Sequence, residues 1–332
     1  MTKVGVVGAG SWGTTVAALC TSNAEVVLWA RRSEVAEEVC HDHRNSAYLP
    51  GFDLPAALRA TTDIADVVGG ADVVVVGVPS HGFRAAVADA APHISEGTPV
   101  VSLSKGVEQG TLRRMTEVIS EELPGCPAGV LTGPNLAKEV MAGQPAASVV
   151  SFSDEAIADR LMDVFGTPLF RVYTNPDVVG CEVAGALKNV VAIAVGMADG
   201  MGFGDNAKAT LITRGLTELS RLGVALGGRP LTFSGLAGMG DLVATCSSPQ
   251  SRNRTVGVAL GRGRTLSDIT AEMDMVAEGV KTSRAVVDIA RSIGMELPIA
   301  FAVASVLYDG WTVEQALASL LARSTGHELE GL

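Results

Sequence analysis

Lys188 has the residue type and the setting needed to move a proton during catalysis. It lies in the middle of the segment Glu182–Val195, which is apolar around nearly its whole circumference and therefore predicts a buried helix. Burial of an ammonium group is costly unless a carboxylate pairs with it or its pKa falls. A lysine tuned toward neutrality can act as a general acid or base. The alternative is a side chain that extends to the rim of the helix and pairs there with a carboxylate.

Lys105 and Asp241 are two further candidates for the same chemistry. Lys105 stands in the segment Ser102–Gly106 at the end of a predicted strand, and ligands of α/β proteins bind at the carboxyl ends of the strands. Asp241 follows the glycine-rich residues 238–240, where it is placed to orient a lysine. An aspartate in such a loop also serves as an ordinary turn or cap residue.

The segment Ser251–Arg254 reads Ser-Arg-Asn-Arg and opens a helical pattern. Backbone N–H groups at a helix N-terminus attract anions, and guanidinium groups form forked, charge-assisted hydrogen bonds with phosphate. The segment therefore predicts a phosphate-binding site, with a solvated helix start as the alternative.

A glycine-rich segment, Gly8–Gly13, has the pattern Gly-x-Gly-x-x-Gly of a dinucleotide-binding loop. In a chain with 38 glycines such hexamers arise by chance, and a turn without a ligand is the alternative. The context is more specific, because the apolar run Val4–Val7 precedes the glycines and the helical pattern Thr14–Leu19 follows them. The first glycine would make the tight turn, the second would admit the pyrophosphate, and the third would let the helix pack against the strand.

The residues after the second apolar run, 26–29, bear on the choice of cofactor. An acidic residue at this place holds the ribose 2′-hydroxyl of NAD, whereas this chain has Arg31 and Arg32. Two guanidiniums suit the 2′-phosphate of NADP, so we favour NADP(H) without excluding NAD(H). A solvated basic helix start is the alternative, although arginine at a helix N-terminus opposes the helix dipole.

Strand and helix patterns alternate through the first half of the chain. Apolar runs predict strands at 4–7, 26–29, 72–78, 99–103, 128–131, 146–150 and 169–173, and helical patterns lie at 83–90, 112–122 and 155–165. This alternation predicts an α/β, Rossmann-like, doubly wound sheet in a dinucleotide-binding domain over residues 1–176. Beyond it only helical periodicity remains, ending with a capping box at Thr312 and Gln315 that opens a last helix through Ala322. We therefore predict an all-α C-terminal domain over residues 177–332.

The composition favours a soluble enzyme. The 332 residues are enough for two domains, and the net charge of −11 argues against nucleic-acid binding, which needs a basic face. Lys188 and Asn189 interrupt the longest apolar run, so we expect no membrane insertion, and no signal peptide before the first strand. The five cysteines form no paired motif, which favours free cytosolic thiols over disulfides or a metal site.

Together these segments resemble one family, the bacterial NAD(P)-dependent glycerol-3-phosphate dehydrogenases, over nearly the whole chain. Besides the glycine loop, the resemblance rests on Tyr48–Pro50, Leu103–Gly106, Gly133-Pro134 with Ala137–Glu139, Ala186–Asn189, Gly238–Asp241, Thr245–Ser248, Ser251–Asn253 and Glu278-Gly279. The Lys-Asn helix and the Ser-Arg-Asn segment in this order are far more specific than the glycine pattern. One residue departs from the family, since Asn135 stands where a serine usually follows Gly-Pro.

The resemblance implies interconversion of sn-glycerol 3-phosphate and dihydroxyacetone phosphate with NAD(P)(H) in the cytoplasm, supplying glycerol 3-phosphate for phospholipid synthesis, by a homodimer formed through the helical domain. It implies Lys188 as the general acid/base, Lys105 as the group that polarises the substrate oxygen, and Asp241 as the support of Lys188. The implied substrate-binding residues are Lys105, Gly133, Asn135, Lys188, Asn189, Asp241, Ser251, Arg252 and Asn253. The implied cofactor-binding residues are Gly8, Gly10, Ser11, Trp12, Gly13, Arg31, Arg32, Tyr48, Lys105, Ala137, Arg252, Val276 and Glu278.

Two other functions stay open at this stage. Another two-domain dehydrogenase, such as one acting on 6-phosphogluconate or a 3-hydroxyacid, would leave Ser251–Asn253 without a clear role. A regulatory protein that senses NADP(H) without chemistry would have no need of Lys105, Lys188 and Asp241 together.

Overall fold

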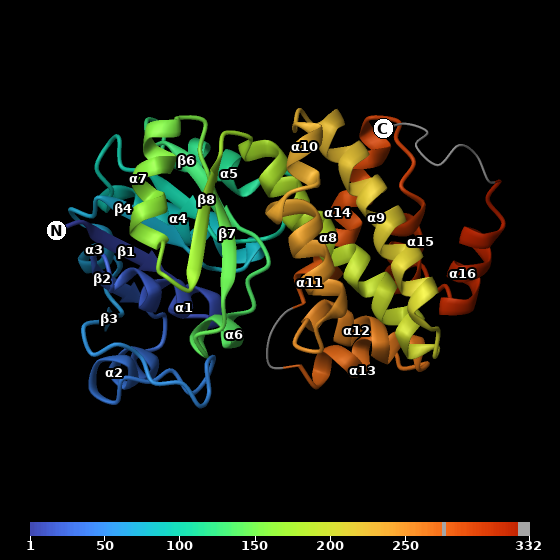
Figure 1. Ribbon diagram of the computed structural model, residues 1–332, viewed down its shortest axis with the longest axis horizontal. Coiled ribbons are helices and arrows are strands. Elements are labelled where there is room, and N and C mark those ends of the chain that lie inside the picture. The colour runs from blue at the N-terminus through green and yellow to red at the C-terminus, as the bar shows by residue number, and fades with distance from the viewer. Residues whose placement is uncertain (274–276, 325–332) are drawn as a thin grey trace. The chain divides into compact units, whose positions relative to one another are not determined.

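The computed structural model describes residues 1–273 and 277–324. The chain divides into two compact units (Figure 1). The sheet unit comprises residues 1–105 and 113–178, and the helical unit comprises residues 106–112 and those from 179 onward. The predicted domain boundary after residue 176 stays a prediction.

The sheet unit is built on one eight-stranded sheet in the order β3-β2-β1-β4-β5-β6-β7-β8. Its strands are β1 (Lys3–Val7), β2 (Glu25–Trp29), β3 (Arg59–Thr61), β4 (Val73–Val76), β5 (Val100–Ser102), β6 (Ala128–Thr132), β7 (Ala146–Ser151) and β8 (Phe170–Asn175). Seven of them confirm the strands predicted from apolar runs. The predicted Rossmann-like, doubly wound sheet is confirmed, because every neighbouring pair except β6 and β7 is parallel.

Two features of the sheet were not predicted. The edge strand β3 has the sequence Arg-Ala-Thr and carries no apolar run, so hydrophobicity alone does not reveal it. Strand β7 runs antiparallel to β6, and the connection between them contains the five-residue helix α6 (Ala137–Met141).

Helices complete the sheet unit and bury both faces of the sheet. Besides α6 they are α1 (Ser11–Cys20), α2 (Ser33–His41), α3 (Ile64–Val68), α4 (Ser80–Ala90), α5 (Met115–Glu122) and α7 (Glu155–Phe165), with a short 3₁₀ turn at Ala91–His93. Along β4, Val73 and Val75 join a core with α1, α2 and α7, whereas Val74 and Val76 join a core with α3, α4 and α5. Burial of successive residues on opposite faces explains the continuous apolar runs of the sequence.

The predicted helix over 112–122 begins later than its periodicity indicates. Leu112 has a φ of 60°, a left-handed conformation that cannot continue a right-handed helix. The helix α5 starts after Arg114, and the carboxylate of Glu117 accepts a hydrogen bond from the Arg114 N–H at 2.8 Å. The capping interaction, rather than the apolar pattern, therefore sets the start of this helix.

In the helical unit, the described residues beyond 178 contain no strand, as predicted. The helices are α8 (Val178–Gly200), α9 (Asp205–Ala225), α10 (Pro230–Phe233), α11 (Asp241–Ser247), α12 (Arg252–Gly261), α13 (Leu266–Ala271), α14 (Glu278–Ser292), α15 (Pro298–Tyr308) and α16 (Val313–Leu321), with a π-helical turn at Leu236–Gly240. The capping box predicted at Thr312 and Gln315 is present at the start of α16, with both hydrogen bonds formed.

Helix α8 is the central helix of this unit, and its residues 180–198 are all buried. It shares a hydrophobic core with α9, α12, α14 and α15. By length and composition α8 is apolar enough to cross a membrane, but 83% of its most apolar window is buried inside the protein. Packing by neighbouring helices therefore accounts for its hydrophobicity.

Candidate active site

The glycine loop between β1 and α1 has the geometry of a dinucleotide-binding turn. Gly8 has a φ of 120°, which side-chain-bearing residues rarely adopt. A Cβ added to Gly13 would lie 2.0 Å from the carbonyl oxygen of Gly8, so only glycine lets α1 pack this closely on the loop. A Cβ added to Gly10 would meet nothing within 4 Å. The loop thus leaves open space at the glycine that the dinucleotide fold reserves for a pyrophosphate.

Ser11 and Trp12 begin α1 and fix its contacts. The Ser11 hydroxyl donates to the carbonyl oxygen of Tyr48 at 2.8 Å. The Trp12 ring packs against Phe170 with ring centroids 6.0 Å apart, and its buried indole N–H has no hydrogen-bond partner among the described residues. An unmet buried donor is costly, and a ligand acceptor at this loop would satisfy it.

Arg31 and Arg32 follow β2 and precede α2, where both side chains are exposed. The Arg32 guanidinium lies 5.4 Å from the centre of the Tyr48 ring, a cation–π distance. The aromatic ring therefore holds one of the two cations beside the carboxyl end of β2. This arrangement fits a 2′-phosphate, and the assignment stays a prediction.

A second group of predicted residues lies where β5 and β6 end. The Lys105 ammonium donates to the carbonyl oxygen of Gly133 at 2.8 Å, and Gly133 itself has a φ of 144°. The Asn135 amide donates to the Ser148 hydroxyl at 3.1 Å, and that hydroxyl donates to Thr132 O at 2.8 Å. Helix α6, which begins at the predicted cofactor residue Ala137, follows directly.

The departure at Asn135 has a structural counterpart. Its longer side chain reaches Ser148 on β7, and its buried Oδ1 has no hydrogen-bond partner among the described residues. The hydrogen bond from the Asn135 amide nitrogen to Ser148 therefore fixes the position of the Asn135 Oδ1 acceptor.

In the helical unit, Lys188 and Asp241 form a buried ion pair. The ammonium lies 2.7 Å from Asp241 Oδ1, and the exposed fractions of the two side chains are 6% and 2%. The Lys188 ammonium also donates to the Thr245 hydroxyl at 2.5 Å, one turn after Asp241 on α11. The alternative of a lysine at the rim is wrong, because α8 is buried over its whole middle and α11 brings the carboxylate to it.

Cys246 is the neighbour of Thr245 and is also buried. Burial raises the pKa of its thiol to about 12. The thiol therefore stays protonated at neutral pH.

Next to the Lys188–Asp241 pair, amide side chains connect the helices α8, α12 and α14. The Asn253 amide donates to Asn189 Oδ1 at 2.8 Å, and the Gly279 N–H donates to Asn253 Oδ1 at 2.9 Å. The Ser251 hydroxyl caps α12 by accepting from the Arg254 N–H at 3.3 Å. These contacts place the Ser-Arg-Asn segment at the start of α12 against the middle of α8.

Close packing of α8 on α12 makes these contacts reachable. A Cβ on Gly196 would lie 2.3 Å from a backbone oxygen of α12, and one on Gly257 would lie 2.1 Å from a backbone oxygen of α8. Such distances are too short for any side chain, so the glycines let the two backbones touch. The same seam includes Gly200 and Gly261.

Arg252 and Glu278 begin α12 and α14. The Arg252 side chain is exposed, and the negative charge of Glu278 interacts with its guanidinium. The predicted cofactor residue Val276 lies outside the described residues.

Two family profiles match the chain. The NAD-dependent glycerol-3-phosphate dehydrogenase N-terminus matches residues 3–158, and the C-terminus of the same family matches residues 177–318. The chain belongs to the NAD-dependent glycerol-3-phosphate dehydrogenase family.

Relatives within this family are similar over nearly their full lengths. A glycerol-3-phosphate dehydrogenase [NAD(P)+] 2 of Sphingopyxis alaskensis is 56% identical over 98% of this chain and 98% of its own. The corresponding enzyme of Mycobacterium avium is 51% identical over 99% of this chain and 97% of its own. The crystal structure of a Coxiella burnetii glycerol-3-phosphate dehydrogenase has a TM-score of 0.93 at 36% identity, covering 97% of this chain and 99% of that one.

The predicted site residues of this glycerol-3-phosphate dehydrogenase family member form two sets, one in each unit of the chain. The sheet unit holds the glycine loop, Tyr48, the two arginines and the Lys105 group, whereas the helical unit holds the Lys188 group and the start of α12. The structure adds three polar residues that the sequence did not single out as site residues: Asn45, Ser148 and Thr245. Only Thr245 left a signal, because it lies four residues after Asp241 on a helix.

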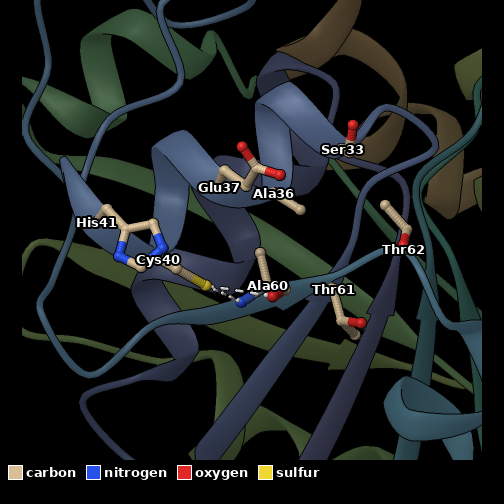
Figure 2. A pocket seen from close by; sticks show the side chains of 8 residues that line it. All are labelled: Ser33, Ala36, Glu37, Cys40, His41, Ala60, Thr61 and Thr62. Atoms are coloured by element: carbon tan, nitrogen blue, oxygen red, sulfur yellow. Dashed lines mark hydrogen bonds between the residues drawn. The ribbon is translucent and has the colours of Figure 1, made fainter.

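A separate hollow of about 260 Å³ lies in the sheet unit between α2 and β3 (Figure 2). Its lining residues are Ser33, Ala36, Glu37, Cys40, His41, Ala60, Thr61 and Thr62. The Cys40 thiol donates to Ala60 O and accepts from Ala60 N–H, each at 3.2 Å. None of the predicted site residues lines this hollow, which belongs to the packing of α2 on β3.

Proposed function

We propose that this chain interconverts sn-glycerol 3-phosphate and dihydroxyacetone phosphate with NADP(H) or NAD(H). The buried Lys188–Asp241 pair beside the start of α12 carries the proposal, because it combines a held ammonium with a segment suited to phosphate. Membership of the glycerol-3-phosphate dehydrogenase family supports the same substrate pair.

The proposed chemistry assigns one task to each lysine. A bound nicotinamide supplies the hydride that adds to the substrate carbonyl carbon. The Lys188 ammonium gives a proton to the oxygen of that carbonyl as it becomes an alkoxide, while Asp241 and Thr245 hold the Lys188 Nζ in position. The Lys105 ammonium stabilises the negative charge on the same oxygen. In the oxidising direction Lys188 takes the proton back.

The remaining site residues bind and orient. Asn189, Ser251 and Arg252 are proposed to hold the substrate phosphate, with Asn253 fixing Asn189 through the hydrogen bond between their amides. Gly133 and Asn135 are proposed to contact the substrate from the sheet unit. The glycine loop suits the dinucleotide pyrophosphate, since its open side at Gly10 admits a ligand.

The wider setting is part of the same proposal. We place the enzyme in the cytoplasm, where its five free thiols are stable, with its product serving phospholipid synthesis. A homodimer through the helical unit is supported by exposed apolar side chains there, namely Leu231, Met239 and Val243.

The decisive test mixes the purified protein with NADPH and dihydroxyacetone phosphate and follows nicotinamide absorbance. Loss of absorbance is expected, whereas binding of NADPH without turnover would identify a dinucleotide sensor. Phosphate recognition is tested by kcat/KM for dihydroxyacetone phosphate and for dihydroxyacetone, in the wild type and in Arg252→Ala, as a cycle. The variant is expected to lose most of its activity on the phosphorylated substrate and little on the other. Equal fractional losses would place Arg252 outside the phosphate site.

A further inference from the structure

Asn45 is a fully buried polar residue that contacts the glycine loop from a distant part of the sequence. It lies in the segment 42–54 after α2, and its exposed fraction is 0%. Its amide nitrogen donates to the carbonyl oxygen of Ala9 at 2.9 Å and to the Thr14 hydroxyl at 2.9 Å. Ala9 lies inside the glycine loop and Thr14 lies one turn into α1, so this one side chain binds both the loop and the helix that follows it.

The contact with Ala9 fixes the direction of a peptide group. The bond between Ala9 and Gly10 is trans, and in a planar trans peptide the C=O and N–H point in opposite directions. Because Asn45 holds the Ala9 oxygen on the buried side, the Gly10 N–H points away from Asn45. Gly10 is also the position where an added Cβ would meet nothing within 4 Å.

Asparagine at this position brings two buried hydrogen bonds and one unmet buried acceptor. Asn45 Oδ1 is buried and has no hydrogen-bond partner among the described residues. An unmet buried acceptor costs about 1–3 kcal/mol, and the two bonds that the amide nitrogen of the same side chain donates to Ala9 and Thr14 offset this cost. Residues that break a local rule in this way are expected where a site needs them.

We propose that Asn45 is a positioning residue for the dinucleotide pyrophosphate, holding the Ala9 oxygen so that the Gly10 N–H is aimed at the bound anion. The proposal depends on one part of the proposed function, namely that a dinucleotide binds this loop. Asn45 acts through the loop and does not touch the reacting atoms.

The same segment also reaches the other cofactor-binding residues predicted here. The carbonyl oxygen of Asn45 accepts from the Tyr48 and Leu49 N–H groups, which closes a turn. That turn presents Tyr48 O to the Ser11 hydroxyl and the Tyr48 ring to Arg32. Asn45 therefore anchors a turn that contacts Ser11 and Arg32, two of the predicted cofactor-binding residues.

The test compares two nearly isosteric variants. One breaks both hydrogen bonds of the Asn45 amide, and the other breaks only the bond to Thr14. Asn45→Leu removes both bonds and frees the Ala9 oxygen. Thr14→Val removes the bond to the same amide but leaves Ala9 held. The dissociation constants of NADPH and NADH are measured by titration of nicotinamide fluorescence, and the free energy of unfolding of each variant is measured without cofactor.

Asn45→Leu is expected to raise the dissociation constants of NADPH and NADH by the same factor, about three- to tenfold, since both carry the pyrophosphate. Thr14→Val is expected to stay within about twofold of the wild type. The KM for dihydroxyacetone phosphate should not change in Asn45→Leu at saturating NADPH. If Asn45→Leu does not fold, Asn45→Ala is compared with Thr14→Val in the same way.

Unchanged cofactor affinity in Asn45→Leu would overturn the proposal. So would affinity losses in both variants that follow their losses of stability, because a structural role alone predicts that pattern. A wild type that binds neither dinucleotide would instead contradict the proposed function.

Discussion

The sheet unit and the helical unit hold their polar site residues in opposite ways. In the sheet unit Arg31, Arg32 and Lys105 follow strand ends, and Arg31 and Arg32 are exposed. In the helical unit Lys188, Asn189 and Asp241 are buried at 5% exposure or less and pair with one another or with neighbouring helices. Substitutions of Arg31 and Arg32 should therefore change ligand binding alone, whereas substitutions of the buried polar residues in the helical unit should change stability as well.

The largest effect is expected for Lys188→Met. Loss of the proton donor should lower kcat by about 10²-fold or more, and loss of the ammonium beside the buried Asp241 carboxylate should lower the free energy of unfolding by about 3–5 kcal/mol. Steady-state kinetics and urea unfolding measure the two effects. In the double variant Lys188→Met/Asp241→Leu, stability should largely recover while turnover stays low. Recovery of turnover together with stability would assign the pair a structural role only.

Glu218 is another buried carboxylate of the helical unit, and it affects stability rather than catalysis. It lies on α9 and accepts from the Ile299 and Ala300 N–H groups at the start of α15, at 2.6 and 3.1 Å. Burial raises its pKa to about 7, although the two N–H groups and the charges of Arg221 and Arg214 oppose this shift. The folded protein therefore binds this proton more tightly than the unfolded chain does.

Stability contributed by the Glu218 proton should be present below pH 4.5 and should be lost as the pH rises from about 4.5 to about 7. The loss should be about 3 kcal/mol. The measurement is the free energy of unfolding of the wild type and of Glu218→Gln between pH 5 and pH 8. The difference in free energy of unfolding between the two proteins should change up to about pH 7 and level off above it. A constant difference would contradict the raised pKa.

A smaller effect, confined to binding, is expected for the double substitution Arg31→Ala/Arg32→Ala. Only NADPH carries a 2′-phosphate, so the ratio of NADPH to NADH affinity should fall by about tenfold or more. Because both side chains are exposed, the free energy of unfolding should change by no more than about 0.5 kcal/mol. Equal weakening of both cofactors, or a large loss of stability, would remove the contrast between the two units.

Several parts of the fold and the site could be read from the sequence because their signals are local. The glycine pattern between a strand and a helix, the continuous apolar runs and the Thr312–Gln315 capping box each depend on neighbouring residues. The start of α5 was missed because a single left-handed residue, Leu112, overrides the periodicity. Strand β3 was missed because its partner β2, rather than its own residues, makes it a strand.

The sequence by itself determined most of the elements, the family and which side chains are able to do chemistry. On residues alone it could not pair Lys188 with Asp241, a pairing that only the family resemblance implied, because the carboxylate lies 53 residues away and the packing of α11 on α8 brings it within 2.7 Å. Nor could it reveal Asn45, whose partners lie 36 and 31 residues away in the chain. Both contacts arise because buried polar groups must find partners wherever the packed elements place them, and that placement is a property of the tertiary structure.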